Sequence, residues 1–329
     1  MRKSLAELPK FLSGIVFIVI VIGSYVIIAQ TPITGEWKAD TRPGKSKDTH
    51  SDVGLRSDNK GSDKLHISFE RSRGEKHKMQ HGSSFAYADL QGLTPDQTQN
   101  GRVSFRLVRE AGTVECEGTF VNGVGSGTFR FTPDAGYLSA MSSRGFDFTK
   151  SGSKHRDASD SRHLEAVEER QFSAALLNVT TALADDLKSV DLGPLDVDDL
   201  FKAAIFKVDS KFMAEMKASG FPDLKMEDLV KARIFKIDAD YVRQVHEMGF
   251  SEKGFEGLVK FRIFKVTPEF LNELKAQGFQ NLSSEEIVKF RIFNIDPEFI
   301  RKAKAEDPNV TVEQMVQMKI GVRRMKDTY

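Results

Sequence analysis

The stretch VKFRIFKVTPEFLNELKAQGF, from Val259 to Phe279, decides the fold, because the same chain carries three further versions of it. These are VKARIFKIDADYVRQVHEMGF (230–250), FKAAIFKVDSKFMAEMKASGF (201–221) and VKFRIFNIDPEFIRKAKAEDP (288–308), each 29 residues from its neighbour. A fixed period of this length is typical of repeat proteins, in which each unit is one supersecondary element. The units begin at Ile205, Ile234, Ile263 and Ile292, with a degenerate earlier unit near Leu176 and a stub at Ile320.

Capping residues divide each unit into two helices. In the third full unit, Thr267 occupies an N-cap position and Pro268 follows at the first helical position. Gly278 is expected to end this helix in a left-handed conformation. Ser283 and Glu286 form a capping box for a second helix, which runs to just before the next Ile-Phe pair. Each unit is therefore predicted to be a helical hairpin.

The apolar face of one hairpin is too small to fold alone. Neighbouring hairpins are therefore expected to stack and to bury their Ile, Phe, Val and Leu side chains in one continuous core. We predict an α-solenoid of about five 29-residue repeats over residues 171–329, ending in a polar cap. This prediction requires four equivalent aromatic side chains to point inward, namely Phe212, Tyr241, Phe270 and Phe299.

Residues 64–148 follow a period of two, which is typical of half-buried strands. Apolar and polar residues alternate in GRVSFRLVRE (101–110) and GTVECEGTF (112–120), with compact glycine-containing turns between such runs. We predict an antiparallel domain of five or six strands, either a small β-sandwich or a partial barrel. The glycines at 118, 123, 125 and 127 are expected to serve turns and close strand contacts. A phosphate-binding loop would need a helix after them.

Polar segments flank this β domain. Residues 30–63 are rich in Gly, Ser, Asp and Lys and are predicted to form a flexible spacer. If a short first strand forms at 33–38, Trp37 would pack on the domain and the spacer would become a long loop. Residues 149–170 have mixed charge and no apolar face, so they are predicted to be a linker that turns helical near its end. The whole chain is thus expected to be an α+β multidomain protein.

The first residues predict a membrane segment. Residues 1–10 contain Arg2, Lys3 and Lys10, and residues 11–29 carry no charge. A helix of that length spans roughly 28 Å, close to the hydrocarbon thickness of a bilayer. We favour an uncleaved signal-anchor over a cleaved signal peptide, because the apolar run is long and lacks an A-x-A motif. In both cases the basic residues keep 1–10 cytoplasmic and send the remaining chain across the membrane.

The composition argues against several classes of protein. The chain has 48 basic and 47 acidic residues, so no global field attracts nucleic acid. Its single cysteine, Cys116, excludes an intramolecular disulfide and fits a buried strand position better than a nucleophile. No residue pattern predicts a catalytic set, a cofactor or a metal site. We therefore expect a protein that is not an enzyme.

Two histidine motifs partly match metal-binding patterns. HEMGF (246–250) lacks the second histidine of the zinc-protease pattern, and Gly249 would break the helix that holds the ligands. In HKMQH (77–81), His77 and His81 could form an adventitious metal pair, although a solvated loop is the stronger interpretation. Neither motif predicts a metal centre.

A ladder of basic residues recurs with the repeat and is the candidate partner-binding surface. Its members are Lys231, Arg233, Lys236, Lys260, Arg262, Lys265, Lys289 and Arg291. Stacked hairpins would align them along one edge, which could meet an acidic partner, an acidic lipid or an anionic polymer. The competing interpretation is a solvated face that pairs with itself, because Glu227, Glu256 and Glu285 each precede a ladder lysine by four residues.

The repeat sequence IFKVTPEFLNELKAQGF…LSSEEIVKFR (263–291) resembles the C-terminal tails of some bacterial membrane metallopeptidases of the beta-lactam-sensor type. The segment FRLVREAGTVECEGTFVNGVGSGTFRFTP (105–133) resembles a domain that precedes such repeats in other bacterial proteins. The similarity spans roughly Lys64 to Arg324, but no catalytic residue carries over, because the peptidase helix with its two histidines has no counterpart here. The resemblance implies a bacterial envelope protein in a sensing or regulatory system.

Together these features predict a single-pass inner-membrane protein whose bulk is periplasmic or extracellular. Its expected role is protein–protein recognition or scaffolding, with another envelope protein as the partner. The alternative is that the β domain binds an envelope polymer or a small ligand and the repeats act as a spacer.

Overall fold

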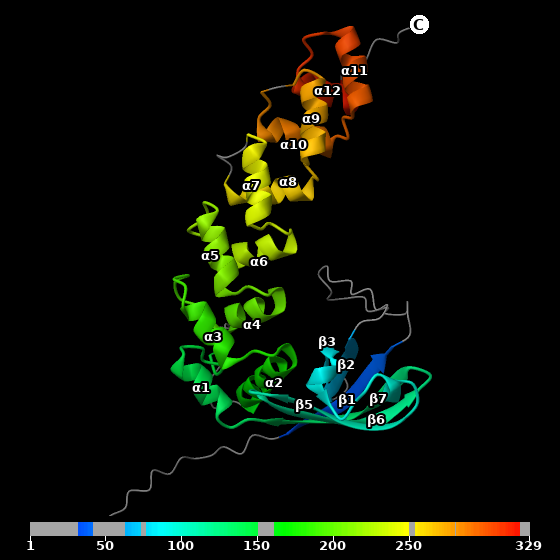
Figure 1. The fold of residues 1–329 in the computed structure, drawn as a ribbon, viewed down its shortest axis with the longest axis vertical. Helices are drawn as coiled ribbons and strands as arrows, with labels where there is room; N and C mark the ends of the chain where they lie inside the picture. The colour runs from blue at the N-terminus through cyan, green and yellow to red at the C-terminus, as the bar shows by residue number, and fades with distance from the viewer. Residues whose placement is uncertain are drawn as a thin grey trace, which may run out of the picture.

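The computed structural model describes residues 32–41, 63–73, 77–150, 161–249, 254–279 and 281–322. A curled antiparallel sheet comes first, and a row of short helices then leads away from it (Figure 1). This arrangement confirms the α+β class predicted from the sequence. The predicted membrane segment at 11–29 lies outside the described residues.

The sheet has seven strands in the order β3-β2-β1-β7-β6-β5-β4, and all neighbours are antiparallel. It curls into a half-barrel, so the partial barrel is confirmed and the sandwich is wrong. Its strands are β1 (Ile33–Asp40), β2 (Lys64–Arg73), β3 (His77–Ala86), β4 (Leu90–Gln91), β5 (Gly101–Arg109), β6 (Gly112–Val121) and β7 (Val124–Pro133).

Strand β1 confirms the first strand that the sequence left open, and it lies between β2 and β7 in the middle of the sheet. The strand is longer than the predicted 33–38, because the inward–outward alternation continues to Asp40. Lys38 points outward and pairs with Glu70 at 2.8 Å, while Ala39 is buried. The polar residues Lys38 and Asp40 thus belong to the end of the strand.

Strand β3 contradicts the prediction of a solvated loop at HKMQH. His77 and His81 lie on β3, which pairs along its length with β2. The ring of His81 contacts that of Phe172, with 6.0 Å between the ring centroids. Burial lowers the pKa of His81, which favours the neutral imidazole. The packing of a helix against this strand, which local sequence does not reveal, accounts for the difference.

Two glycines leave the space between strands that the indole of Trp37 needs. Gly118 and Gly127 face each other across β6 and β7, and Trp37 is paired with Gly127 on β1. A Cβ atom at Gly127 would lie 1.9 Å from the carbonyl oxygen of Glu117. The fully buried indole donates a hydrogen bond of 3.1 Å to that same oxygen. The predicted role of these glycines in close strand contact is confirmed.

Helix α2 (Ser161–Leu177) packs against the strands and closes the half-barrel, and the shorter α1 (Tyr137–Ser143) precedes it in the chain. Phe172 inserts among the rings of Phe129 and Phe131, with centroid distances of 5.2 and 5.1 Å. Residues 161–170 of the predicted linker thus form the first part of α2, as expected for a linker that turns helical near its end. Charged side chains of this helix also contact the sheet, since Glu169 lies 3.6 Å from Arg71 of β2.

The remaining helices come in pairs, and consecutive even-numbered helices contact one another from α2 to α12. Their bounds are α3 (Thr181–Lys188), α4 (Val197–Phe206), α5 (Ser210–Ala218), α6 (Met226–Ile234), α7 (Ala239–Glu247), α8 (Phe255–Ile263), α9 (Pro268–Ala276), α10 (Ser284–Ile292), α11 (Pro297–Glu306) and α12 (Val312–Lys319). The caps at Thr267 and Ser283 and the left-handed Gly278 are as predicted.

One residue in the turn after each even-numbered helix from α2 to α10 is also left-handed, with φ between 49° and 57°. This conformation costs residues other than Gly, Asn and Asp roughly 1–2 kcal/mol, because Cβ approaches the following carbonyl. Asparagine suits the position, but three of the five turns use lysine. The residues are Asn178, Lys207, Lys236, Lys265 and Asn294.

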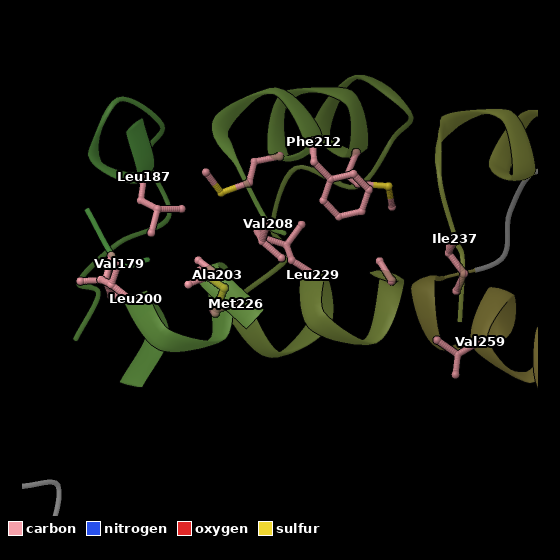
Figure 2. Packing of buried hydrophobic residues seen from close by; sticks show 14 of the residues in the cluster. Val179, Leu187, Leu200, Ala203, Val208, Phe212, Met226, Leu229, Ile237 and Val259 are labelled. Atoms are coloured by element: carbon pink, nitrogen blue, oxygen red, sulfur yellow. The ribbon is translucent and has the colours of Figure 1, made fainter. Parts of the chain in front are cut away.

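The core of the stack lies between the odd-numbered and the even-numbered helices. Figure 2 shows Leu187 and Phe212 facing Leu200, Ala203 and Leu229 across this space. The predicted inward aromatic residues are confirmed in three units, where their exposed fractions are 3–6 %, and the fourth is half-buried. They are Phe212, Tyr241, Phe270 and Phe299.

The repeated isoleucines depart from this core. The sequence predicted that they are buried, but their exposed fractions range from 38 to 54 %. In α6, Leu229 and Ala232 point into the core, and Ile234 lies about 200° around the helix from Ala232. The exposed residues are Ile205, Ile234, Ile263, Ile292 and Ile320.

Helix α8 offers a test of the capping argument. Its N-cap is Gly254, which makes no side-chain cap, whereas the equivalent Ser283 of α10 forms a capping box with Glu286. The double variant G254S/G257E should raise the free energy of unfolding by about 1 kcal/mol, since it replaces two glycines and completes the box. Urea denaturation followed by circular dichroism measures it, with S283G/E286G as the opposite control. A double variant no more stable than the natural chain would contradict the argument.

Candidate binding edge on the helical stack

The predicted basic ladder lies at the C-terminal ends of α6, α8 and α10 and in the turns that follow them. Repetition of the hairpin therefore brings the ladder residues to equivalent positions on consecutive repeats, as the sequence predicted. Their contacts divide them into a group that joins repeats and a group that faces solvent.

The three arginines join repeats. The guanidinium carbon of Arg262 lies 3.6 Å from the ring centroid of Tyr241, and the group donates a 2.7 Å hydrogen bond to the carbonyl of Lys236. Arg233 stacks on Phe212 and Arg291 on Phe270 at nearly the same distances, 3.7 and 3.8 Å. Each guanidinium thus reaches back toward the preceding turn. These contacts are structural, because stacking occupies all three groups and a hydrogen bond to a backbone carbonyl also holds those of Arg262 and Arg291.

Two ladder lysines join even-numbered helices. Lys231 pairs with Glu256 of the next even helix at 2.6 Å, and Lys289 pairs with Glu313 at 2.7 Å. A residue outside the ladder, Lys202, makes the same contact with the next helix. The hydrogen bonds with the glutamates raise the pKa of Lys231 and Lys289. Self-pairing is therefore real, and its shortest contacts run between repeats, while Lys231 also lies 3.7 Å from Asp228 of its own helix.

The remaining ladder residues, Lys236, Lys260 and Lys265, are exposed. Within the described ranges, their ammonium groups make no ion pair and donate no hydrogen bond; the same holds for Lys207 of the preceding repeat. Three of these four lysines occupy the left-handed turn position. Each therefore holds a free positive charge at the surface.

An exposed isoleucine accompanies each lysine of the turns. Ile234 and Lys236 lie two residues apart in one turn, and the flanking repeats have the same combination. We call this set the basic–aliphatic edge, which consists of Ile205, Lys207, Ile234, Lys236, Ile263 and Lys265. Sequence reasoning missed its isoleucines because it assigned every repeated apolar residue to the core. The angular offset from Ala232 was the signal that could have found them.

Other candidate sites have ordinary structural explanations. Cys116 is buried, and burial raises the pKa of its thiol, so the thiol stays neutral. Ser84 Oγ lies 3.2 Å from Nδ1 of His66, but the two are exposed cross-strand neighbours and line neither of the two best-formed cavities. Each of these cavities is about 10 Å³, which is room for one water molecule.

The described ranges contain no group of three His, Cys, Asp or Glu residues that could hold a metal ion. In the same ranges, none of the helices combines the length and the apolar character that crossing a bilayer requires.

The stacking of Arg262 gives a testable prediction. Arg262→Ala should lower the free energy of unfolding by about 1–2 kcal/mol, because it removes a cation–π contact and a hydrogen bond between turns. Arg262→Lys should recover little, since an ammonium group cannot form both contacts in the same geometry. Arg243→Ala is the control, because this exposed arginine pairs only within its helix. Equal losses for Arg262→Ala and Arg243→Ala in urea denaturation would refute the structural role.

Comparison with known proteins adds no relative, since neither a family model nor a curated protein nor a solved structure matches this chain.

Proposed function

We propose that the chain is a membrane-anchored interaction module that acts outside the cytoplasm and performs no chemistry of its own. Its helices form an α-solenoid that presents the basic–aliphatic edge to another protein of the bacterial envelope. The single observation that carries the proposal is this edge, on which three consecutive turns expose an isoleucine and an unpaired lysine. Exposed apolar side chains in a row, rather than singly, are typical of interaction sites.

The filled half-barrel favours this proposal over ligand binding by the β domain. Its interior holds the fully buried side chains of Trp37, Phe105, Phe120 and Phe131. The nearby cavity between Phe69, Phe129 and Phe172 has room for one water molecule. Small-molecule sites are usually clefts of about 300–1,000 Å³. The β domain thus better fits a support on which the solenoid is mounted.

Site-specific photocrosslinking in native membranes tests the proposal. A benzophenone amino acid would replace Lys236 or Lys265 on the edge, exposed Arg243 on another face of the solenoid, or exposed Val121 on the β domain. We expect protein adducts from the two edge positions and few from Arg243 or Val121. Adducts from Val121 alone would favour the β domain as the binding part. The absence of protein adducts at both edge positions would contradict the proposal.

The proposed side of the membrane can be tested separately. Ala214→Cys introduces an exposed thiol on α5, while the natural Cys116 is buried and gives little background. We expect a membrane-impermeant maleimide to label the variant in intact bacterial cells whose outer membrane has been permeabilised. Labelling only after the inner membrane is lysed would place the solenoid in the cytoplasm and refute this part.

A further inference from the structure

We infer that the basic–aliphatic edge binds an acidic, aliphatic protein segment that lies lengthwise along three consecutive repeats. This inference rests on the proposed function and adds the chemistry of the partner. Four observations support it. They are the repetition of exposed isoleucine, the backbone conformation of the lysines, the backbone hydrogen bonds that nearby carboxylates already accept, and the spacing of the repeats.

The isoleucines are repeated although they are exposed. Ile stands at this position in all four full units, with exposed fractions of 43, 38 and 49 % in the three turns of the edge. Another exposed position of the same repeats varies freely, since it is Ala214, Arg243, Asn272 and Arg301 in successive units. Stacking therefore does not dictate the residue type at exposed positions. The retained isoleucines indicate a requirement for apolar contact from outside the solenoid.

The lysines are retained against the preference of the backbone. Lys207, Lys236 and Lys265 adopt φ angles of 57°, 54° and 50°, in a region that favours Gly and Asn. The equivalent positions in the flanking repeats are Asn178 and Asn294, with φ of 54° and 49°. Asparagine thus fits the turn, yet the three central repeats place a positive charge there. Unfavourable backbone conformations that persist in a structure are concentrated at functional sites.

The acidic residues next to these lysines are already engaged. Asp209 accepts a hydrogen bond from the backbone N–H of Phe212 at 2.8 Å, and Asp238 accepts one from Tyr241 at 2.9 Å. After Lys265, the equivalent residue Thr267 caps α9 in the same way and carries no charge. These carboxylates are held at helix N-termini as N-caps and form no ion pair with the neighbouring lysines, which leaves each ammonium group with an unpaired positive charge. A partner with carboxylates would complement it.

The repeat spacing fits an elongated partner. Helices in contact lie about 8–10 Å apart, so the three turns lie at intervals of that order. On a helical partner, side chains seven residues apart lie on the same face, and they are about 10.5 Å apart along the axis at 1.5 Å per residue. A segment of about 15–20 residues, with aliphatic side chains for the isoleucines and Asp or Glu for the lysines, would cover the edge. A single row of isoleucines favours such a segment over a flat lipid surface.

A peptide selection with matched charge variants tests the inference. The full chain is the bait for a displayed library of random 20-residue peptides, and the selected peptides are then measured against K207N/K236N/K265N. This variant should be at least as stable as the natural chain in thermal denaturation, because Asn suits the left-handed turn. The control K211Q/K217Q/K275Q removes the same charge from α5 and α9. I205S/I234S/I263S tests the aliphatic half of the edge.

We expect the selected peptides to be rich in Asp, Glu and aliphatic residues. Their affinity should fall at least tenfold for K207N/K236N/K265N and for the isoleucine variant, and should stay within about twofold for the control. Peptides without an acidic surplus, an empty selection, or equal losses in control and edge variants would overturn the inference. Binding of phosphatidylglycerol vesicles in place of peptides would instead identify the edge as a lipid-binding surface.

The two proposals fail in different ways. Protein adducts at Lys236 or Lys265 that map to a segment without acidic residues would contradict the inferred partner chemistry alone. The absence of protein adducts at these positions would contradict the proposed function itself.

Discussion

Replacing Phe172 by alanine should lower the free energy of unfolding of the β domain by about 3–5 kcal/mol, the usual cost of removing a large core aromatic side chain. Phe172 is 5 % exposed and inserts from α2 into the half-barrel. Its ring stacks on Phe129 with an interplanar angle of 4° and meets Phe69 edge-on at 6.0 Å. No neighbouring element can fill the resulting cavity, because the strands around it are held by their ladders.

Two spectroscopic signals in one urea titration measure this effect. The fluorescence of Trp37, the single tryptophan, reports on the half-barrel, and circular dichroism at 222 nm reports mainly on the helices. We expect the fluorescence midpoint of Phe172→Ala to fall most, because contacts in a stack extend only to neighbours. Val121→Ala, at a 59 % exposed strand position, is the control. A fluorescence midpoint unchanged in Phe172→Ala would mean that α2 does not close the half-barrel.

Gly127→Ala should cost about 3 kcal/mol or more, at the upper end of overpacking effects. The added methyl carbon would lie 1.9 Å from the carbonyl oxygen of Glu117 and 2.6 Å from Cα of Gly118. Both obstacles are backbone atoms in the middle of the sheet, so no side-chain rotation relieves them. The strands would have to separate, which would also break the hydrogen bond from Trp37 to Glu117.

The fluorescence of Trp37 should therefore change in position as well as in midpoint, since separated strands admit water to the indole. Gly254→Ala is a matched control, because its φ is −58° and a methyl group there meets no atom within 4 Å. An alanine at position 127 that leaves both the emission maximum and the midpoint unchanged would show that the sheet adapts without cost.

Much of the helical stack could be predicted because its signals are local. The caps at Thr267 and Ser283 and the left-handed Gly278 depend on residues within four positions of each other. The alternation of β5 and β6 identified their strands for the same reason. The 29-residue period then indicated that the hairpins stack, although no single hairpin contains that information.

The errors concern contacts between distant segments. The partner of Lys231 is Glu256 of the next even helix, and this choice depends on how two repeats pack. The exposure of Ile234 likewise depends on which side of α6 receives its neighbours. The contacts of Phe172 and Gln171 with the sheet likewise join segments that lie far apart in the sequence. A period of 29 residues indicates that units repeat, but it does not indicate how neighbouring units are oriented relative to each other.

Helix α2 both covers the half-barrel and forms the first helix of the stack. Because one helix belongs to both parts, no flexible hinge separates the half-barrel from the first repeats. Gln171 donates hydrogen bonds to the carbonyls of Ala111 and Asp134, and the buried hydroxyl of Tyr137 donates one to the carbonyl of Val179. Domains joined by a bare linker swivel freely, but here rotation would break these bonds. The direction in which the edge faces is thus fixed relative to the half-barrel, so a change in the orientation of strand β1 would turn the first repeats with it.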